Sequence, residues 1–165
     1  MLIRQIFISS GHNYFGHHGQ APDNYPLKEV PSIECVAGRG IRGDRFYDYK
    51  DNYKGQITFF SFEVFEKLAA HFGLTGKSAG AVRRNVVVSG VHLNDLIGEE
   101  FSIQGVRLRG TAHCRPCYWL DQAVAPGAEQ FLAGNGGLRA QILSDGVIAV
   151  GDAELVLAAP RLIEN

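Results

Sequence analysis

The sequence is poor in several features that mark whole classes of protein. It has only three cysteines in 165 residues, and an odd number in a chain of this size argues against a disulfide framework. No apolar run approaches the roughly 18 residues that span a bilayer, and the first ten residues carry no small-residue cleavage pattern. The formal net charge is only −1, so nothing global favours a nucleic-acid or anionic-membrane partner. We therefore expect a cytoplasmic protein with neither kind of partner.

The residue types that are abundant in the sequence favour a single β-rich domain. Hydrophobic residues make up 45% and charged residues 20% of the chain, as is typical of a soluble globular domain that can bury a substantial core. The sequence shows no repeat, low-complexity tract or linker, so we predict one domain over residues 1–165. Twenty glycines indicate many tight turns.

Short apolar or alternating segments predict about eight or nine strands. Two connections carry hairpin signals, namely Gln104-Gly105 and Asp145-Gly146, and the second is the strongest in the chain. The main strand segments are residues 2–9, 29–37, 56–60, 82–88, 101–109, 138–143, 147–150 and 154–158.

One segment has clear helical periodicity. Apolar residues recur at helical spacing between Phe62 and Phe72, Ser61 is a suitable N-cap, and Gly73 is a suitable stop. Two shorter helices are expected on either side of Pro126. Hairpins outnumber β-helix-β units, so we predict a mainly β fold, a single-domain barrel with one clear helix and short helical turns.

Two loops hold candidate ligand-binding residues. The first contains His12, His17 and His18, which together are either a metal site or a solvated loop. The second, Gly38–Arg45, has three glycines and three arginines in eight residues. It is either an anion-binding loop or a glycine-rich turn with exposed arginines.

The paired cysteines at Cys114 and Cys117 are the most reactive motif in the chain. Basic neighbours can hold a thiol as thiolate, the form that attacks electrophiles and binds metals. A zinc site with His113, or a dithiol switch, is an alternative, although adjacent strand residues point to opposite faces and a closed zinc site needs four ligands. The third cysteine, Cys35, lies in an apolar strand and is expected to be a core residue.

Four motifs, taken in order, resemble the MOSC domain, the module named for the C-terminal part of molybdenum-cofactor sulfurases. They span about residues 38 to 157, and the family's β-barrel fold agrees with the strand count. The matching pieces are Gly40–Arg45, Arg83-Arg84-Asn85 before an apolar strand, Cys114-Arg115-Pro116-Cys117, and Gly136–Ala140 leading to Gly146–Asp152.

The resemblance implies a cysteine that ligates molybdenum or carries a persulfide, and the position that matches it is Cys117. Thiolate is the softest side-chain ligand for such a metal. The arginines of the matching stretches would grip the phosphate of the molybdenum cofactor, since a planar guanidinium suits phosphate. Cys114 is predicted to support the loop or to resolve an oxidised Cys117. The implied cofactor-binding residues are Arg42, Asp44, Arg45, Arg83, Arg84, Asn85 and Cys114, with Cys117 as the catalytic residue and metal ligand.

Three functional hypotheses follow from the residues and the resemblance. The first is a molybdenum-cofactor protein that reduces N-hydroxylated or N-oxide small molecules. The second is a persulfide carrier for metal-sulfur cofactor assembly, and the third is a non-catalytic zinc or dithiol module. The family's association with pyridoxal phosphate belongs to an aminotransferase-like domain that we do not find. The possible partners are a small-molecule substrate, a sulfur donor or acceptor protein, and a separate redox protein. The chain could also form an oligomer.

Overall fold

A computed structural model describes residues 1–14 and 19–159, and within them most of the secondary structure is strand. The strands are β1 (Leu2–Ile8), β2 (Lys28–Glu29), β3 (Ser32–Val36), β4 (Gly40–Ile41), β5 (Ile57–Ser61), β6 (Val86–Ser89), β7 (Glu100–Ile103), β8 (Val106–His113), β9 (Leu138–Ile142), β10 (Gly146–Ala149), β11 (Gly151–Asp152) and β12 (Leu155–Leu157). The helices are α1 (Phe62–Phe72), α2 (Trp119–Ala123) and α3 (Ala128–Phe131), with 3₁₀ turns η1 (Ala79–Val82) and η2 (Leu93–Leu96).

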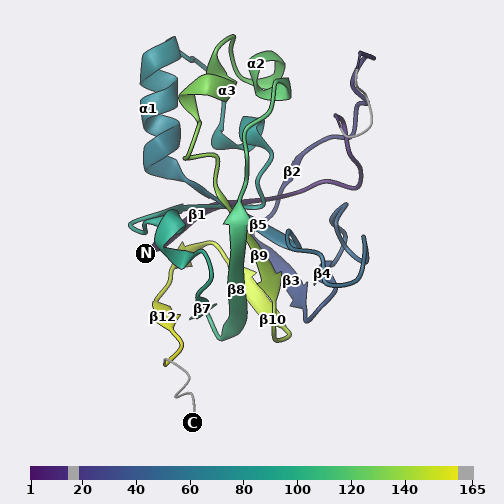
Figure 1. Ribbon diagram of the computed structural model, residues 1–165, viewed down its shortest axis with the longest axis vertical. Coiled ribbons are helices and arrows are strands. Elements are labelled where there is room, and N and C mark those ends of the chain that lie inside the picture. Colours follow the sequence, from purple (N-terminus) through teal and green to yellow (C-terminus); the bar gives the residue numbers. More distant parts are fainter. Residues whose placement is uncertain (15–18, 160–165) are drawn as a thin grey trace.

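The strands form a large mixed sheet and a small one. The large sheet runs β11-β1-β6-β5-β9-β8-β7-β12, with β2 added to β1, and the small sheet runs β10-β3-β4. Within the large sheet β5 and β6 are parallel, and the other neighbours are antiparallel. The three helices gather at one end of the molecule, above the strands in Figure 1.

The central strands carry a hydrophobic core on each face. Along β6, Val86 and Val88 join one buried cluster with the small sheet, whereas Val87 joins a second cluster with the helices. Neighbouring β5 divides in the same way, with Phe59 on one side and Phe60 on the other. Alternating side chains explain both divisions, and each such burial contributes about 1.5–3 kcal/mol.

The mainly β class and the long helix are confirmed. Ser61 caps α1 by accepting a hydrogen bond from the Val64 backbone N–H (3.3 Å), and Gly73 ends it in the left-handed conformation at φ 60°. The two short helices, α2 and α3, do lie on either side of Pro126. The expected barrel is not closed, because among the described residues β11 and β12 end the strand order without pairing to each other. No described helix has the length and apolar character that crossing a membrane requires.

One hairpin prediction is confirmed and the other is wrong. Gln104 and Gly105 both have positive φ, 48° and 82°, and they join the antiparallel pair β7 and β8. Asp145-Gly146 instead carries the chain from β9 to a different sheet, where β10 pairs with β3. Both edges of β9 are already occupied by β5 and β8, so it has no free edge for β10. The Asp145 carboxylate accepts a hydrogen bond from the Ala37 N–H (2.7 Å) and secures the crossing.

Candidate functional site

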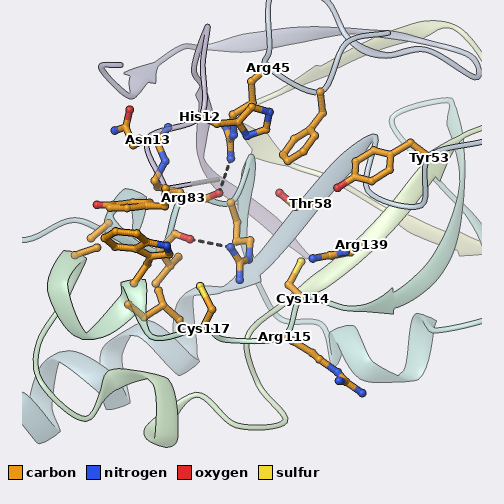
Figure 2. A pocket seen from close by; sticks show the side chains of 18 residues that line it. His12, Asn13, Arg45, Tyr53, Thr58, Arg83, Cys114, Arg115, Cys117 and Arg139 are labelled. Atoms are coloured by element: carbon orange, nitrogen blue, oxygen red, sulfur yellow. Dashed lines mark hydrogen bonds between the residues drawn. The ribbon is translucent and has the colours of Figure 1, made fainter. Parts of the chain in front are cut away.

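A cavity of about 380 Å³ lies where the loops after β1 and β4 meet the end of β8 and the short helices. Figure 2 shows side chains from all these segments converging on it. Its lining residues are His12, Asn13, Tyr14, Arg45, Phe46, Tyr53, Thr58, Ala81, Val82, Arg83, Arg84, Cys114, Arg115, Cys117, Trp119, Leu120, Ala123 and Arg139. Five of these residues are arginines and none is an aspartate or glutamate.

Both cysteines of the paired motif line this cavity, but their surroundings differ. Cys114 directly follows β8, its side chain is only 3% exposed, and its N–H donates to the Gly137 carbonyl (2.8 Å). Cys117, three residues later, is exposed, and its carbonyl accepts the Leu120 N–H at the start of α2. All three cysteines of the chain are free thiols. The motif therefore offers one accessible sulfur and one buried sulfur to the same cavity.

Two glycines just before β9, Gly136 and Gly137, lie very close to the backbone of neighbouring segments at the cavity. Gly137 has φ 110°, and a Cβ there would lie 2.3 Å from the Phe59 carbonyl oxygen. A Cβ on Gly136 would lie 2.2 Å from the Cys114 carbonyl oxygen. Only residues without a side chain permit both approaches, so these glycines position the Cys114 backbone against β9.

Three arginines are fixed around the cavity by protein oxygens. Arg45 donates to the Asp44 carboxylate (3.3 Å) and to the Arg83 carbonyl (3.1 Å). Arg83 donates to the Ser9 hydroxyl (3.1 Å), and Arg84 donates to the Gly136 carbonyl (3.0 Å). These bonds hold the guanidinium groups in place before any ligand arrives.

The paired arginines do not begin a strand as predicted. Arg83 follows η1 with φ 55°, a left-handed conformation that is uncommon for a residue with a side chain. The strand β6 starts only at Val86. The turn sends Arg83 towards the loop after β1 and Arg84 towards the loop before β9. Both side chains nevertheless line the cavity, so the change of backbone serves to spread them around it.

The electrostatics of the cavity favour a negatively charged ligand. Burial lowers the pKa of Arg45, and the neighbouring Arg84 adds to that effect, while Asp44 opposes it. Burial and the charge of Arg45 likewise lower the pKa of Arg83. Burial, with Arg45 and Arg83, also lowers the pKa of His12, so that imidazole is neutral at pH 7. Arginine stays protonated despite such shifts, so the cavity wall holds positive charges that an anion would stabilise.

Three of the residues suggested by the family resemblance lie outside the cavity lining. Arg42 is exposed and forms an ion pair with Glu34 (2.9 Å). Asp44 is buried, and its carboxylate accepts from the Ser9 N–H (3.1 Å), the Phe46 N–H (3.3 Å) and Arg45. Asp44 thus orients an arginine that reaches the cavity, whereas Arg42 does not reach it.

The third of these residues, Asn85, joins three strands. Its amide nitrogen donates to the Phe7 carbonyl (3.2 Å), and its amide oxygen accepts from the Thr58 N–H (3.1 Å) and hydroxyl (2.9 Å). The residue is 1% exposed. Its position is that of an internal cross-link between β1, β5 and β6.

The structure also brings to the cavity residues that the sequence analysis did not select. Arg139 lies on β9, and Phe46 and Tyr53 come from the loop after β4. Arg139 stands between buried positions in an alternating strand, and that pattern is a usable signal for a side chain on the opposite face. The aromatic rings had no such signal, because their loop has no regular period.

No group of three or more histidine, cysteine, aspartate or glutamate side chains in the described parts of the chain could hold a metal ion. The alternative metal site at His12, His17 and His18 depends on two residues outside those parts. His12 itself lines the cavity and packs against Phe46, with ring centroids 4.8 Å apart.

The three thiols are expected to differ strongly in reactivity. Burial raises the pKa of Cys35 from 9.0 to about 12, so at pH 8 only about one molecule in 10⁴ carries that thiolate. Treatment of native protein with iodoacetamide at pH 8 should alkylate Cys117 first, and Cys35 at least about 1,000-fold more slowly. Peptide mass spectrometry over time measures both rates, and labelling in denaturant, where all three should react, is the control. Equal rates at Cys35 and Cys117 in the native protein would contradict the buried position of Cys35.

Comparisons with known proteins agree with this arrangement. The MOSC domain sequence family matches residues 17–153. The YuaD protein from Bacillus subtilis has a similar structure, with a TM-score of 0.76, 18% identity, and 96% of each chain covered. YiiM from Geobacillus stearothermophilus has a TM-score of 0.69 at 19% identity, covering 96% of this chain and 75% of YiiM. YiiM from Escherichia coli has a TM-score of 0.66 at 16% identity, covering 96% and 70%.

No curated protein sequence matches the chain. Identities below 20% to the solved structures establish the fold alone, whereas the family match covers most of the sequence. By sequence and by fold, the chain belongs to the MOSC domain family.

Proposed function

We propose that this MOSC protein binds the molybdenum cofactor through the Cys117 thiolate and reduces N-hydroxylated or N-oxide small molecules. One observation carries the proposal: the accessible Cys117 sulfur and the side chains of Arg45, Arg83 and Arg84 line one cavity that no described carboxylate lines. A soft thiolate suits molybdenum, and guanidinium groups suit the cofactor's phosphate.

The residues present fit such a group. Among the described residues, the partners of Arg83 and Arg84 leave some of their N–H groups unused, and Arg45 is oriented by the buried Asp44. These three side chains would hold the phosphate, and Cys117 would hold the metal. When bound, the cofactor supplies two-electron redox chemistry at a metal with sulfur ligands.

Several other residues that line the cavity are apolar. The rings of Tyr14 and Trp119 pack together with centroids 4.8 Å apart, and Val82 and Leu120 are buried beside them. These apolar side chains lower the local dielectric along one wall of the cavity, which strengthens charge interactions beside them. His12, being neutral at pH 7, leaves the arginines as the positive charges of this wall.

Loading with the cofactor tests the proposal. Purified protein mixed with molybdenum cofactor and passed through a desalting column should retain about one molybdenum per chain by elemental analysis. Arg83→Gln should weaken retention by about tenfold or more, because a charge-assisted hydrogen bond is worth about 1.5–3 kcal/mol. Arg42→Gln is the matched control, since Arg42 lies outside the cavity, and it should change retention less than about twofold. Wild-type protein that retains no molybdenum would refute the proposal.

A persulfide carrier is the second candidate, and the exposure of Cys117 favours it, because a protein donor must reach the sulfur directly. The Cys117 thiolate would attack the outer sulfur of a persulfide on a donor cysteine. A sulfur–sulfur bond forms at Cys117 as the donor's sulfur–sulfur bond breaks, and the donor leaves as a thiolate, so there is no net oxidation. A sulfur-donor protein would then be the partner that docks over Cys117.

A further inference from the structure

Arg139 differs from the three fixed arginines of the cavity. The guanidinium groups of Arg45, Arg83 and Arg84 all donate to protein oxygens. Within residues 1–14 and 19–159, the Arg139 guanidinium has no hydrogen-bond or ion-pair partner, although the residue is half-buried and lines the cavity. A cation held in a partly dry cavity without a partner is costly, so an anionic ligand would be bound favourably there.

The backbone of Arg139 is paired with a strand on each side, so the point from which its side chain leaves the sheet is well defined. Arg139 lies in the middle of β9, opposite Thr58 of β5 on one side and Ala112 of β8 on the other. Its carbonyl oxygen also lies 3.0 Å from the Thr111 hydroxyl oxygen. Figure 2 shows the side chain reaching from this strand to the neighbourhood of Cys114.

Tyr53 presents a hydroxyl group to the same part of the cavity. Burial raises its pKa, while the nearby charge of Arg139 opposes that rise, so the hydroxyl is a neutral donor at pH 7. It has no hydrogen-bond partner among the described residues either. Its ring stacks on Phe46 with centroids 5.2 Å apart, and the loop is tied to β8 by the Thr111 hydroxyl donating to the Lys54 carbonyl (2.5 Å).

These groups occupy a separate side of the cavity. Figure 2 shows Arg139 and Tyr53 reaching in from the side of Cys114, whereas Arg83 and Cys117 lie on the opposite side. Arg115 also lines the cavity, but its side chain is exposed and extends away from the centre. The cavity thus has two cationic regions, one built from fixed arginines and one built from an unpartnered arginine and a tyrosine.

We propose that Arg139 and Tyr53 form a subsite for a carboxylate, and that the substrate is a small carboxylic acid with an aromatic or apolar body. A planar guanidinium can donate two parallel hydrogen bonds to a carboxylate, and the tyrosine hydroxyl can donate a third. The ring of Phe46, beside Tyr53, provides an apolar surface for the rest of the molecule. The assignment to a substrate rests on the proposed function, whereas the existence of the subsite does not.

Benzoate and its neutral counterpart benzamide are suitable probes. Titrated into the protein and followed by isothermal calorimetry or NMR, benzoate should bind at least about tenfold more tightly than benzamide, since a charge-assisted pair is worth about 1.5–3 kcal/mol. Arg139→Gln should remove this preference, and Tyr53→Phe should reduce it about threefold, the loss of one ordinary hydrogen bond. Arg139→Lys should restore part of it. The control Arg115→Gln should retain the preference within about twofold.

The outcomes separate the subsite from the cofactor proposal. A preference for benzoate that survives Arg139→Gln, in a variant that melts like wild type, would overturn the subsite. Loss of molybdenum retention in Arg139→Gln would also overturn the subsite, because Arg139 would then be one of the residues that bind the phosphate of the cofactor. If wild type retains no molybdenum but Arg139→Gln still removes the benzoate preference, the carboxylate subsite stands and the cofactor proposal fails.

Discussion

Replacing Cys117 with serine should reduce molybdenum retention to less than about one-tenth of the wild-type value, because a hydroxyl is a poor replacement for a soft thiolate ligand. The same variant should lose the persulfide adduct of about 32 Da that a cysteine desulfurase would place on this thiol if the protein carries sulfur. The physical basis is exposure: Cys117 is the accessible sulfur of the cavity, and a bulky cofactor or donor protein can reach it. Elemental analysis measures the metal, and intact-protein mass spectrometry measures the adduct.

Cys114→Ser is the matched control for that experiment, since it makes the same atomic change three residues away. Cys114 is 3% exposed, and its backbone N–H donates to the carbonyl of Gly137, just before β9, a bond that the substitution leaves in place. We expect this variant to keep at least about half of the wild-type retention or adduct, allowing a modest cost for a buried hydroxyl. Equal loss in the two variants would show that the cysteines act as a pair, and the division of roles between them would be wrong.

Asn85→Ala should lower the free energy of unfolding by about 3 kcal/mol and the melting temperature by about 6–12 °C. The side chain bonds to Phe7 and Thr58 from a position that is 1% exposed, so the substitution leaves buried polar groups without partners on β1 and β5, the two strands that flank β6. Urea denaturation followed by circular dichroism gives the free energy, and a thermal scan gives the midpoint.

Asn94→Ala is the matched control for Asn85. The Asn94 amide also donates one hydrogen bond to a backbone carbonyl, that of Gly134 (3.0 Å), but it is exposed to solvent. Water can replace that hydrogen bond, so Asn94→Ala should lower the free energy of unfolding by less than about 1 kcal/mol. If the two variants unfold at the same urea concentration, Asn85 is not the cross-link that its contacts indicate.

Local features of the sequence were sufficient to predict local structure. The N-cap at Ser61, the stop at Gly73 and the Gln104-Gly105 turn are each governed by a few adjacent residues, and all three have the predicted form. The Asp145-Gly146 hairpin failed because strand pairing depends on which edges are free. With β9 enclosed by β5 and β8, the turn could only lead to another sheet.

The residues of the candidate site were likewise predicted only in part from the sequence. The motif order of the family resemblance selected Arg45, Arg83, Arg84 and Cys117, and the structure places all four on one cavity. The same motif included Arg42, only three residues from Arg45, and that residue lies outside the cavity in an ion pair with Glu34. Spacing along the chain does not determine the direction of a side chain in an irregular loop, and β3, which carries Glu34, comes from outside the motif.

The sequence by itself determined the family, the mainly β class and the identity of the candidate nucleophile, because these depend on residue types in a fixed order. Tertiary structure alone decided which of the two thiols is accessible and which arginines share a wall with it. It also brought Arg139 and Tyr53 together, although they are 86 residues apart and lie on different elements. Burial and partner availability arise only when distant segments pack. No local pattern could therefore have distinguished the fixed arginines from Arg139, whose guanidinium has no partner in the described parts of the chain.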